Sequence, residues 1–105
     1  MSSNIHSMSK RVLKSISNQA GTLTEGQNIA KVRFSLTQWQ DFIDNQVPGL
    51  KSASGSIQFE KTREASSFFN SRGSALLRGG GIEARIILVS MDRFDVTGPV
   101  TDITL

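Results

Sequence analysis

The stretch IAKVRFSLTQWQDFIDNQVPG, residues 29–49, carries the clearest structural signal in the chain. In its first part, apolar Ala30, Val32 and Phe34 alternate with charged and polar residues. Alternation of this kind places the apolar side chains on one face of an extended chain. The pattern predicts a strand that is buried on one side and carries basic residues on the other.

The rest of the stretch has the spacing of a helix. Ser35 is a favourable N-cap residue, and Gln38 three residues later completes a capping box. Trp39 and Phe42 then fall on one helical face, and a Pro-Gly pair ends the pattern. We therefore expect a helix over residues 36–46.

The same residues carry a resemblance to known sequences. The segment VRFSLTQWQDFI, residues 32–43, is similar to a segment of small uncharacterised bacteriophage-encoded proteins, in which a strand runs into a Ser-x-x-Gln-Trp-x-x-Phe helix. The resemblance implies a phage or mobile-element origin, and with it a location in the cytoplasm of a bacterial host. It implies nothing about a functional site.

The N-terminal region also has helical periodicity. Residues 4–17 predict a short amphipathic helix with basic residues on its wet side, and its apolar face is formed by Ile5, Met8, Val12 and Ile16. Residues 18–28 are a loop by composition, because glycines interrupt a polar segment. We expect a single domain over residues 1–105, in which residues 1–28 could form a semi-independent basic helix plus loop.

The second half of the chain is rich in strand signals. A polar loop is expected over residues 50–55, and residues 62–70 favour a short helix over a continued strand. The β-branched run at 82–91 is apolar on both faces, which predicts a central strand or one covered on both sides. The expected strands of this half are 56–61, 82–91, and one or two short ones around 94–96 and 100–103.

Together these elements predict an α+β fold. A chain of 105 residues suits one small domain. We expect a mostly antiparallel sheet of four or five strands, with one capped helix and the N-terminal amphipathic helix. No apolar run approaches the ~20 residues of a membrane span, so no membrane partner is expected.

The residue types argue against an enzyme. The chain has no cysteine, which excludes disulfides, thiol catalysis and thiolate metal sites. His6 is the only histidine and has no carboxylate near it in sequence. Asp92 and Asp95 could hold a divalent ion or act as an acid–base pair, but the turn-residue interpretation is favoured. We expect neither a cofactor nor a metal.

Three consecutive glycines interrupt the segment SRGSALLRGGGIEARIILVS, residues 71–90. Nucleotide-binding glycine motifs open a helix, whereas these glycines precede a strand, so the pattern argues against both Walker-type and dinucleotide loops. The first interpretation is a flexible turn before the strand. The alternative is a mobile loop in which Arg72 and Arg78 contact a phosphate backbone or an acidic partner.

Charge placement leads to the functional prediction. The net charge is +3, and residues 1–35 alone hold five cations against one carboxylate. We expect a non-enzymatic accessory protein that binds nucleic acid electrostatically. The expected contacts are Lys10, Arg11, Lys14, Lys31 and Arg33, with Arg72 and Arg78 in the glycine loop.

A second functional class remains open. Adjacent Phe68 and Phe69 cannot easily both point inward, so one could anchor a protein partner together with the apolar face of residues 5–16. The chain would then be a protein–protein module, either an inhibitor of a host factor or a self-assembling homo-oligomer.

Overall fold

The computed structural model describes residues 8–43, 47–69 and 74–103. In these residues the chain forms six strands and one short helix, α1 Ala65–Phe69, preceded by a 3-10 turn at Thr62–Glu64. The strands are β1 Met8–Glu25, β2 Asn28–Ile43, β3 Val47–Phe59, β4 Ser74–Gly79, β5 Ile82–Ser90 and β6 Arg93–Asp102. The expected α+β fold with four or five strands is therefore wrong, because the strands close into an antiparallel barrel.

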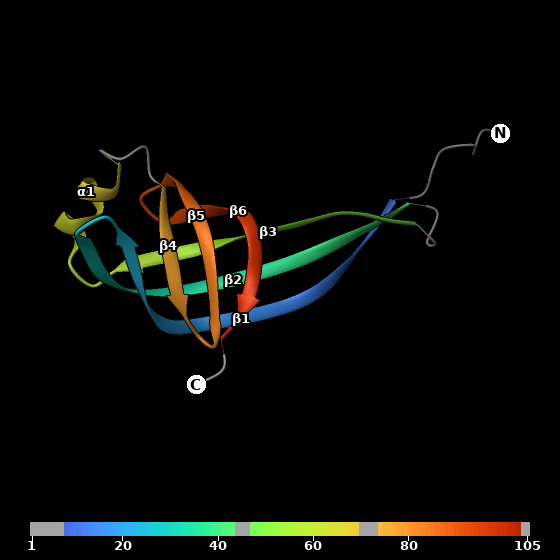
Figure 1. Ribbon diagram of the computed structural model, residues 1–105, viewed down its shortest axis with the longest axis horizontal. Helices are drawn as coiled ribbons and strands as arrows, with labels where there is room; N and C mark the ends of the chain where they lie inside the picture. The colour runs from blue at the N-terminus through green and yellow to red at the C-terminus, as the bar shows by residue number, and fades with distance from the viewer. Residues whose placement is uncertain (1–7, 44–46, 70–73, 104–105) are drawn as a thin grey trace.

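Two three-stranded meanders make the barrel (Figure 1). The order around it is β1-β2-β3-β6-β5-β4, and every neighbouring pair is antiparallel. The connection from β3 to β4 carries α1, which lies at one end of the barrel. This crossover lets β6 pair with β3 and β4 pair with β1, so both meanders are joined at both sides.

Alternate residues of the strands fill the barrel interior. On β2, Val32, Phe34 and Leu36 are all at most 2% exposed, and the intervening residues face outward. The other buried apolar residues come from every strand and from α1, and they form one cluster. The strand expected from the alternation over 30–35 is thus confirmed, and so is its inward set of side chains.

Glycines allow the barrel to close between β1 and β4. Gly21 and Gly79 lie opposite each other in the register of these strands. A Cβ atom on Gly21 would lie 2.8 Å from the carbonyl oxygen of Arg78 and 2.8 Å from Cε1 of Phe34. A Cβ atom on Gly79 would lie 2.5 Å from the carbonyl oxygen of Ala20. The two strands can approach only because neither glycine has a side chain.

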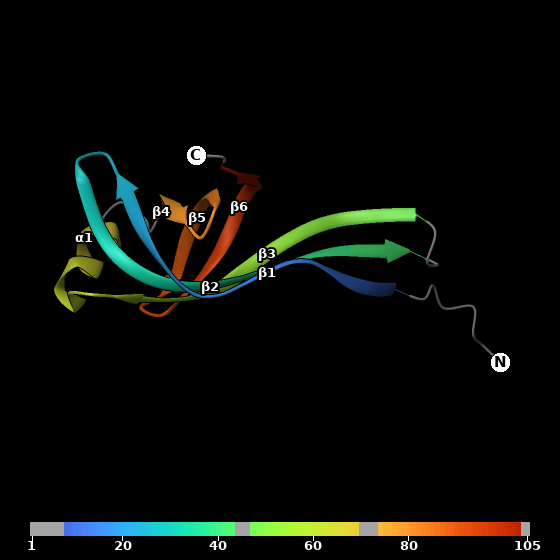
Figure 2. The ribbon, with the colours of Figure 1, turned by 90° about the horizontal axis from the view of Figure 1, so that it is seen from below.

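Three of the strands extend beyond the barrel (Figure 2). We call the extension the arm and define it as residues 8–15, 37–43 and 47–52. Because of the arm, the molecule measures 55 × 31 × 21 Å and its radius of gyration is 15.9 Å. A compact domain of this length would have a radius of gyration of about 13 Å. The arm is therefore a sheet with a solvent-facing surface on each side.

The helix expected over 36–46 is wrong. Residues 36–43 continue β2 and pair with β1 on one side and β3 on the other. Residues 44–46 lie outside the described residues. In the arm no core dictates an alternation of apolar residues, so Gln38 and Gln40 occupy the face that is apolar inside the barrel. The apolar residues that remain, Trp39 and Phe42, have helical spacing, and this spacing led to the wrong prediction. The helix expected in the phage-like segment is therefore a strand in this chain.

The N-terminal helix is wrong as well. Residues 8–25 form β1, which pairs with β2 along its length and with β4 over 21–24, so residues 18–25 are not a loop. The described structure begins at Met8, and the first part of the expected helix lies outside it. Register shifts between Val12 and Lys14 and between Ile16 and Gln19 mark bulges. Each bulge changes which face the next residue joins, and this breaks the two-residue period.

In the second half, the expected loop at 50–55 belongs to β3, and one strand, β6, replaces the two short final ones. The strand expected at 56–61 is confirmed as far as Phe59. The short helix of 62–70 and the strand of 82–91 are confirmed as α1 and β5. However, β5 is not covered on both sides, because Val89 is 55% exposed. No helix of the described residues is long and apolar enough to cross a membrane.

Candidate nucleic-acid interface

The outer face of β2 and β3 carries a row of polar side chains on each strand. Since Val32, Phe34 and Leu36 point inward, the odd-numbered residues between them share the opposite face. This row runs along β2 from the barrel into the arm and contains Lys31, Arg33, Ser35, Thr37 and Trp39. The register places Ser52, Ser54, Ser56 and Gln58 of β3 beside it.

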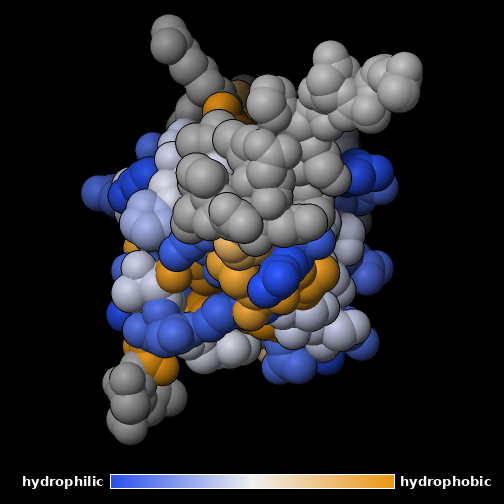
Figure 3. All heavy atoms as spheres, turned by 90° about the vertical axis from the view of Figure 1, so that its right-hand side faces the viewer, coloured by the Kyte–Doolittle hydropathy of each residue, from blue (hydrophilic) through white to orange (hydrophobic). Residues whose placement is uncertain are grey.

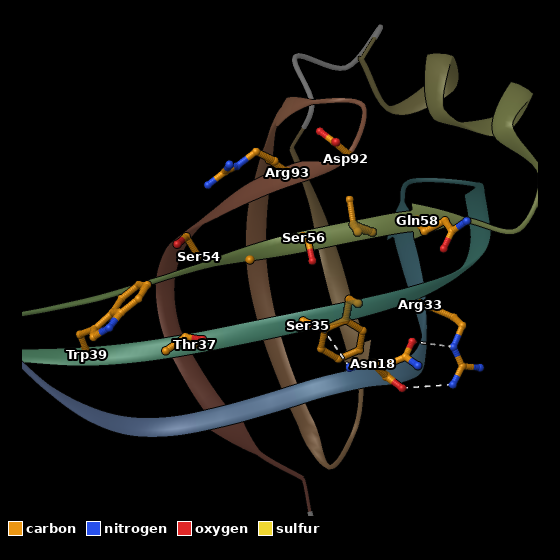
Figure 4. Close-up of a pocket in the computed structure, with 13 residues that line it drawn as sticks. Asn18, Arg33, Ser35, Thr37, Trp39, Ser54, Ser56, Gln58, Asp92 and Arg93 are labelled. Carbon is orange, nitrogen blue, oxygen red and sulfur yellow. Dashed lines mark hydrogen bonds between the residues drawn. The ribbon is translucent and has the colours of Figure 1, made fainter.

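A groove of about 740 Å³ runs across this face (Figure 4). Hydroxyl and amide side chains from β2 and β3 form its floor, including Thr37, Ser56 and Gln58. Trp39 lies at the arm end and Arg33 at the opposite end, while Arg93 lies at the side formed by the β5–β6 turn. The groove therefore combines neutral hydrogen-bonding groups with two guanidinium groups and one indole.

The bulge of β1 forms the wall beside Arg33. Asn18 has a φ of 50°, and its backbone N–H donates to the Ser35 hydroxyl at 2.9 Å. The Arg33 guanidinium donates from Nε to Asn18 Oδ1 at 3.0 Å and from Nη2 to the Asn18 carbonyl oxygen at 3.1 Å. These bonds connect β2 to the bulge and position the Arg33 side chain at the rim of the groove.

A second hollow, of about 520 Å³, lies on the other side of Arg33. It is lined by Lys31, Arg33, Arg78 and Glu60, over the small residues of β1 near the Gly21–Gly79 contact. The register explains this arrangement, because Thr22 of β1 is opposite Lys31 of β2 and opposite Arg78 of β4. Arg33 lines both hollows, so they adjoin at this residue on the outer face.

The arm continues this face with more positive charge. Its described residues carry four cations and one carboxylate, a net charge equal to the +3 of the whole chain. The cations are Lys10, Arg11, Lys14 and Lys51, and the carboxylate is Asp41. Lys14 pairs with Asp102 of β6. Viewed toward the arm's end, hydrophilic residues surround a smaller apolar area (Figure 3).

Two of the arm's cations lie over aromatic rings. Lys10 Nζ is 5.8 Å from the centroid of the Trp39 ring, and the guanidinium carbon of Arg11 is 5.0 Å from that of Phe42. Trp39 belongs to the outer face and Phe42 to the opposite one, so each face of the arm presents an aromatic ring beside a cation. Such pairs hold the cation close to the surface without neutralising its charge.

The structure thus brings together some of the residues expected from the sequence and separates others. Lys31, Arg33 and Arg78 line one hollow, although Arg78 also pairs with Glu83 at 3.0 Å. Lys10, Arg11 and Lys14 lie together on the arm. Arg72 and His6 lie outside the described residues. We refer to the outer-face cations Lys10, Lys31, Arg33, Arg78 and Arg93 as the basic track.

The glycine segment is a hairpin turn. Gly80 and Gly81 connect β4 to β5 with φ values of 58° and 81°, a conformation that glycine adopts without steric penalty. The glycines therefore form a turn before β5, and contact of Arg72 and Arg78 with a partner stays a prediction.

The phenylalanine anchor is wrong for Phe68. This residue is 1% exposed and packs on Phe59 with ring centroids 5.9 Å apart. Phe69 is partly buried against the same core. Neither ring therefore forms a protruding anchor at this end of the barrel.

Sequence reasoning missed Trp39, Lys51 and Arg93. The sequence pattern places Trp39 on a helical face with Phe42, whereas it lies on the same strand face as Arg33. A signal was present in the polar alternation of Ser35, Thr37 and the serines of 52–56, which is typical of a solvent-facing strand surface. Arg93 reaches the groove only through the pairing of β3 with β6, where it lies opposite Ser56.

The acidic residues do not form a metal site in the described part of the chain, where no group of three or more His, Cys, Asp or Glu residues could hold an ion. Asp92 accepts a hydrogen bond from the Ser90 hydroxyl at 2.9 Å, and its carbonyl oxygen accepts one from the Ile57 N–H at 2.9 Å. Asp92 is thus held by hydrogen bonds in the β5–β6 turn, which agrees with the turn-residue interpretation.

No protein-family model, no curated protein and no solved structure matches the chain.

Proposed function

We propose that the protein is a small non-enzymatic binding protein that holds nucleic acid along the basic track. The observation that carries this proposal is the sharing of Arg33 by two hollows, which joins Lys31 and Arg78 at one end to Trp39 and Lys10 at the other. From Lys31 to Trp39 the strand spans eight residues, or about 26 Å at ~3.3 Å per residue. A polyanion with regularly spaced charges suits a surface of this length.

Electrostatics favours a polyanion over an acidic protein surface. Lysine and arginine side chains that contact phosphates release counterions, and this drives binding regardless of sequence. Two carboxylates, Asp92 and Glu60, line the two hollows, and Asp92 is hydrogen-bonded within its own turn. Hydroxyl and amide groups of the floor can donate to phosphate and sugar oxygens as well. These groups can hydrogen-bond nucleic acid without requiring any one sequence.

The experiment is a fluorescence-anisotropy titration with a labelled oligonucleotide at several salt concentrations. We expect affinity to fall steeply between about 50 and 200 mM salt. The variant Lys10→Gln/Lys31→Gln removes one cation from each part of the track and should lower the salt slope by about 1.4–1.8, because each phosphate contact contributes ~0.7–0.9.

The matched control is Arg63→Gln/Arg85→Gln, which removes two exposed cations that lie outside both hollows. Its net charge equals that of the track variant, so a general charge effect would change both alike. Equal losses in the two variants, or no binding by the wild type even at the lowest salt, would refute the proposal.

A second candidate function is protein binding at the end of β5. Val89 is 55% exposed and Met91 is 50% exposed, and the two lie two residues apart. Exposed apolar residues that gather in this way are typical of protein contact surfaces. Light scattering of the wild type and of Val89→Lys/Met91→Lys tests the self-assembling version. A wild type that stays monomeric at every concentration would eliminate that version.

Pairing of arms through their strand edges is not favoured. In the described residues, no strand pairs with the outer edge of β1 over 8–20. This edge contains two bulges and three cations, and β3 contributes Pro48, which has no N–H group to donate. Bulges, charged residues and proline are features that protect exposed edges from adding another strand. The faces of the arm are therefore favoured over its edges as binding surfaces.

A further inference from the structure

We infer that the groove between Arg33 and Trp39 takes single-stranded nucleic acid with its bases turned toward the sheet. The inference rests on the proposed function and specifies its ligand. A duplex presents phosphates to a shallow sheet surface, because its bases are paired and stacked inside. The floor of this groove instead offers groups that suit exposed bases, namely Thr37, Ser54, Ser56 and Gln58.

The position of Trp39 is the main evidence that bases face the sheet. It is half-buried on the outer face, and it does not belong to the apolar core cluster of the described residues. Its register partner on β1 is Val12, which is 59% exposed, so the ring has no apolar layer to join on this side. An indole beside hydroxyl groups and a lysine is a platform on which an unpaired base can stack, and stacking tolerates any base.

The arginines are placed to hold the backbone of such a strand. The two hydrogen bonds from Arg33 to Asn18 use two of about five guanidinium N–H donors and fix the plane of the group. The remaining donors are available to a phosphate at the end of the groove opposite Trp39. Arg93, the first residue of β6, lies beside the groove and is exposed.

The dimensions limit how much of a strand is held. Arg33 and Trp39 are six residues apart on β2, which is about 20 Å at ~3.3 Å per residue. Single-strand sites on small barrels cover about 4–16 nucleotides, and a groove of this length belongs at the lower end of that range. The strand would continue over Lys10 on the arm or toward Lys31 and Arg78.

The test compares a labelled single strand of about 12 thymidine nucleotides with a duplex of equal length, a length within the usual site range. We expect the single strand to bind at least tenfold more tightly than the duplex, an estimate of roughly one stacked base. Because the chain contains one tryptophan, quenching of its fluorescence reports directly on Trp39.

Trp39→Ala should lower affinity for the single strand roughly tenfold while leaving the salt slope unchanged, since stacking releases no counterions. Affinity for the duplex should not change. Trp39→Phe should recover most of the loss, which a purely structural role would not explain if circular dichroism shows all variants folded. Val12→Ala is the matched control, because it alters the neighbouring residue on the same face.

Three outcomes would overturn the inference. If the duplex binds as tightly as the single strand, or if Trp39→Ala leaves binding unchanged, the groove does not stack bases, but nucleic-acid binding along the track still stands. If neither form binds, the proposed function fails as well, and protein binding remains as the candidate function.

Discussion

Arg33 on β2 holds Asn18 on β1 with two hydrogen bonds, of 3.0 Å from Nε to Oδ1 and 3.1 Å from Nη2 to the carbonyl oxygen. Asn18 is the non-glycine residue with positive φ in the described chain, and asparagine tolerates this region better than most residues. The contact stabilises the β1 bulge between Ile16 and Gln19, which forms one wall of the groove. A residue expected to bind phosphate therefore also shapes the site.

Arg33→Lys should lower the free energy of unfolding by about 1 kcal/mol, because lysine keeps the charge but cannot form both bonds of the guanidinium fork. The exposure of the pair keeps the effect at this modest size. Urea denaturation followed by circular dichroism measures it. Lys31→Ala, on the same strand face, should change stability by less than about 0.5 kcal/mol. An equal effect of both substitutions would contradict the role given to Arg33.

Gly55→Ala should prevent the barrel from forming its native contacts. A Cβ atom at this position would lie 1.9 Å from the carbonyl oxygen of Ser35 and 2.8 Å from Cζ of Phe94. Both β2 and β6 pass this close to β3, so a loss of about 3 kcal/mol or more is expected in urea or thermal unfolding. Gly98→Ala serves as the control, since no atom lies within 4 Å of its added Cβ. A Gly55→Ala protein of normal stability would show that the strands are farther apart.

Asp41→Asn should strengthen nucleic-acid binding. Asp41 is the carboxylate of the described arm, and its Oδ1 is buried without a hydrogen-bond partner. Removing a negative charge about 8 Å from a phosphate is worth ~0.5 kcal/mol in water, so we expect roughly a twofold gain at low salt. Stability should not fall, because the unpaired oxygen contributes nothing favourable. Glu25→Gln, at the β1–β2 turn and outside both hollows, should leave affinity unchanged; a gain of the same size there would indicate a non-local charge effect.

Gly81 tests whether the glycine segment is only a turn. Its φ is 81° and no atom lies within 4 Å of a Cβ added there, so conformational strain alone should act. Gly81→Ala should cost about 1–2 kcal/mol of stability, and Gly81→Asn less, because asparagine tolerates this conformation. Thermal unfolding measures both. Neither variant should alter affinity for nucleic acid, and a selective loss of affinity would restore the mobile-loop interpretation.

The sequence predicted the strands well over residues 30–35 and 82–90, where one face borders the core, but it predicted no strand for β4, although Ala75 and Leu77 are buried. Burial of one strand face produces a pattern that can be recognised in a short stretch of sequence. This is the origin of the alternation through Val32 and Phe34 and of the β-branched run of β5. The prediction failed in the arm and along β1. There the strands are extended because neighbours hydrogen-bond to both sides of residues 37–43, while these side chains lie outside the core cluster. Propensity and spacing could not show this, because the partners are distant in sequence.

The sequence by itself determined which side chains of β2 oppose each other, since the two-residue period of a strand puts Arg33 and Phe34 on different faces. It also determined the excess of cations near the N-terminus. Only the tertiary structure decided that Arg78 and Arg93 join Arg33 on one surface. Closure of β4 on β1 and of β6 on β3 brings these residues together from distant parts of the chain. Such closure depends on long-range hydrogen bonding between strands, which no local stretch of sequence encodes.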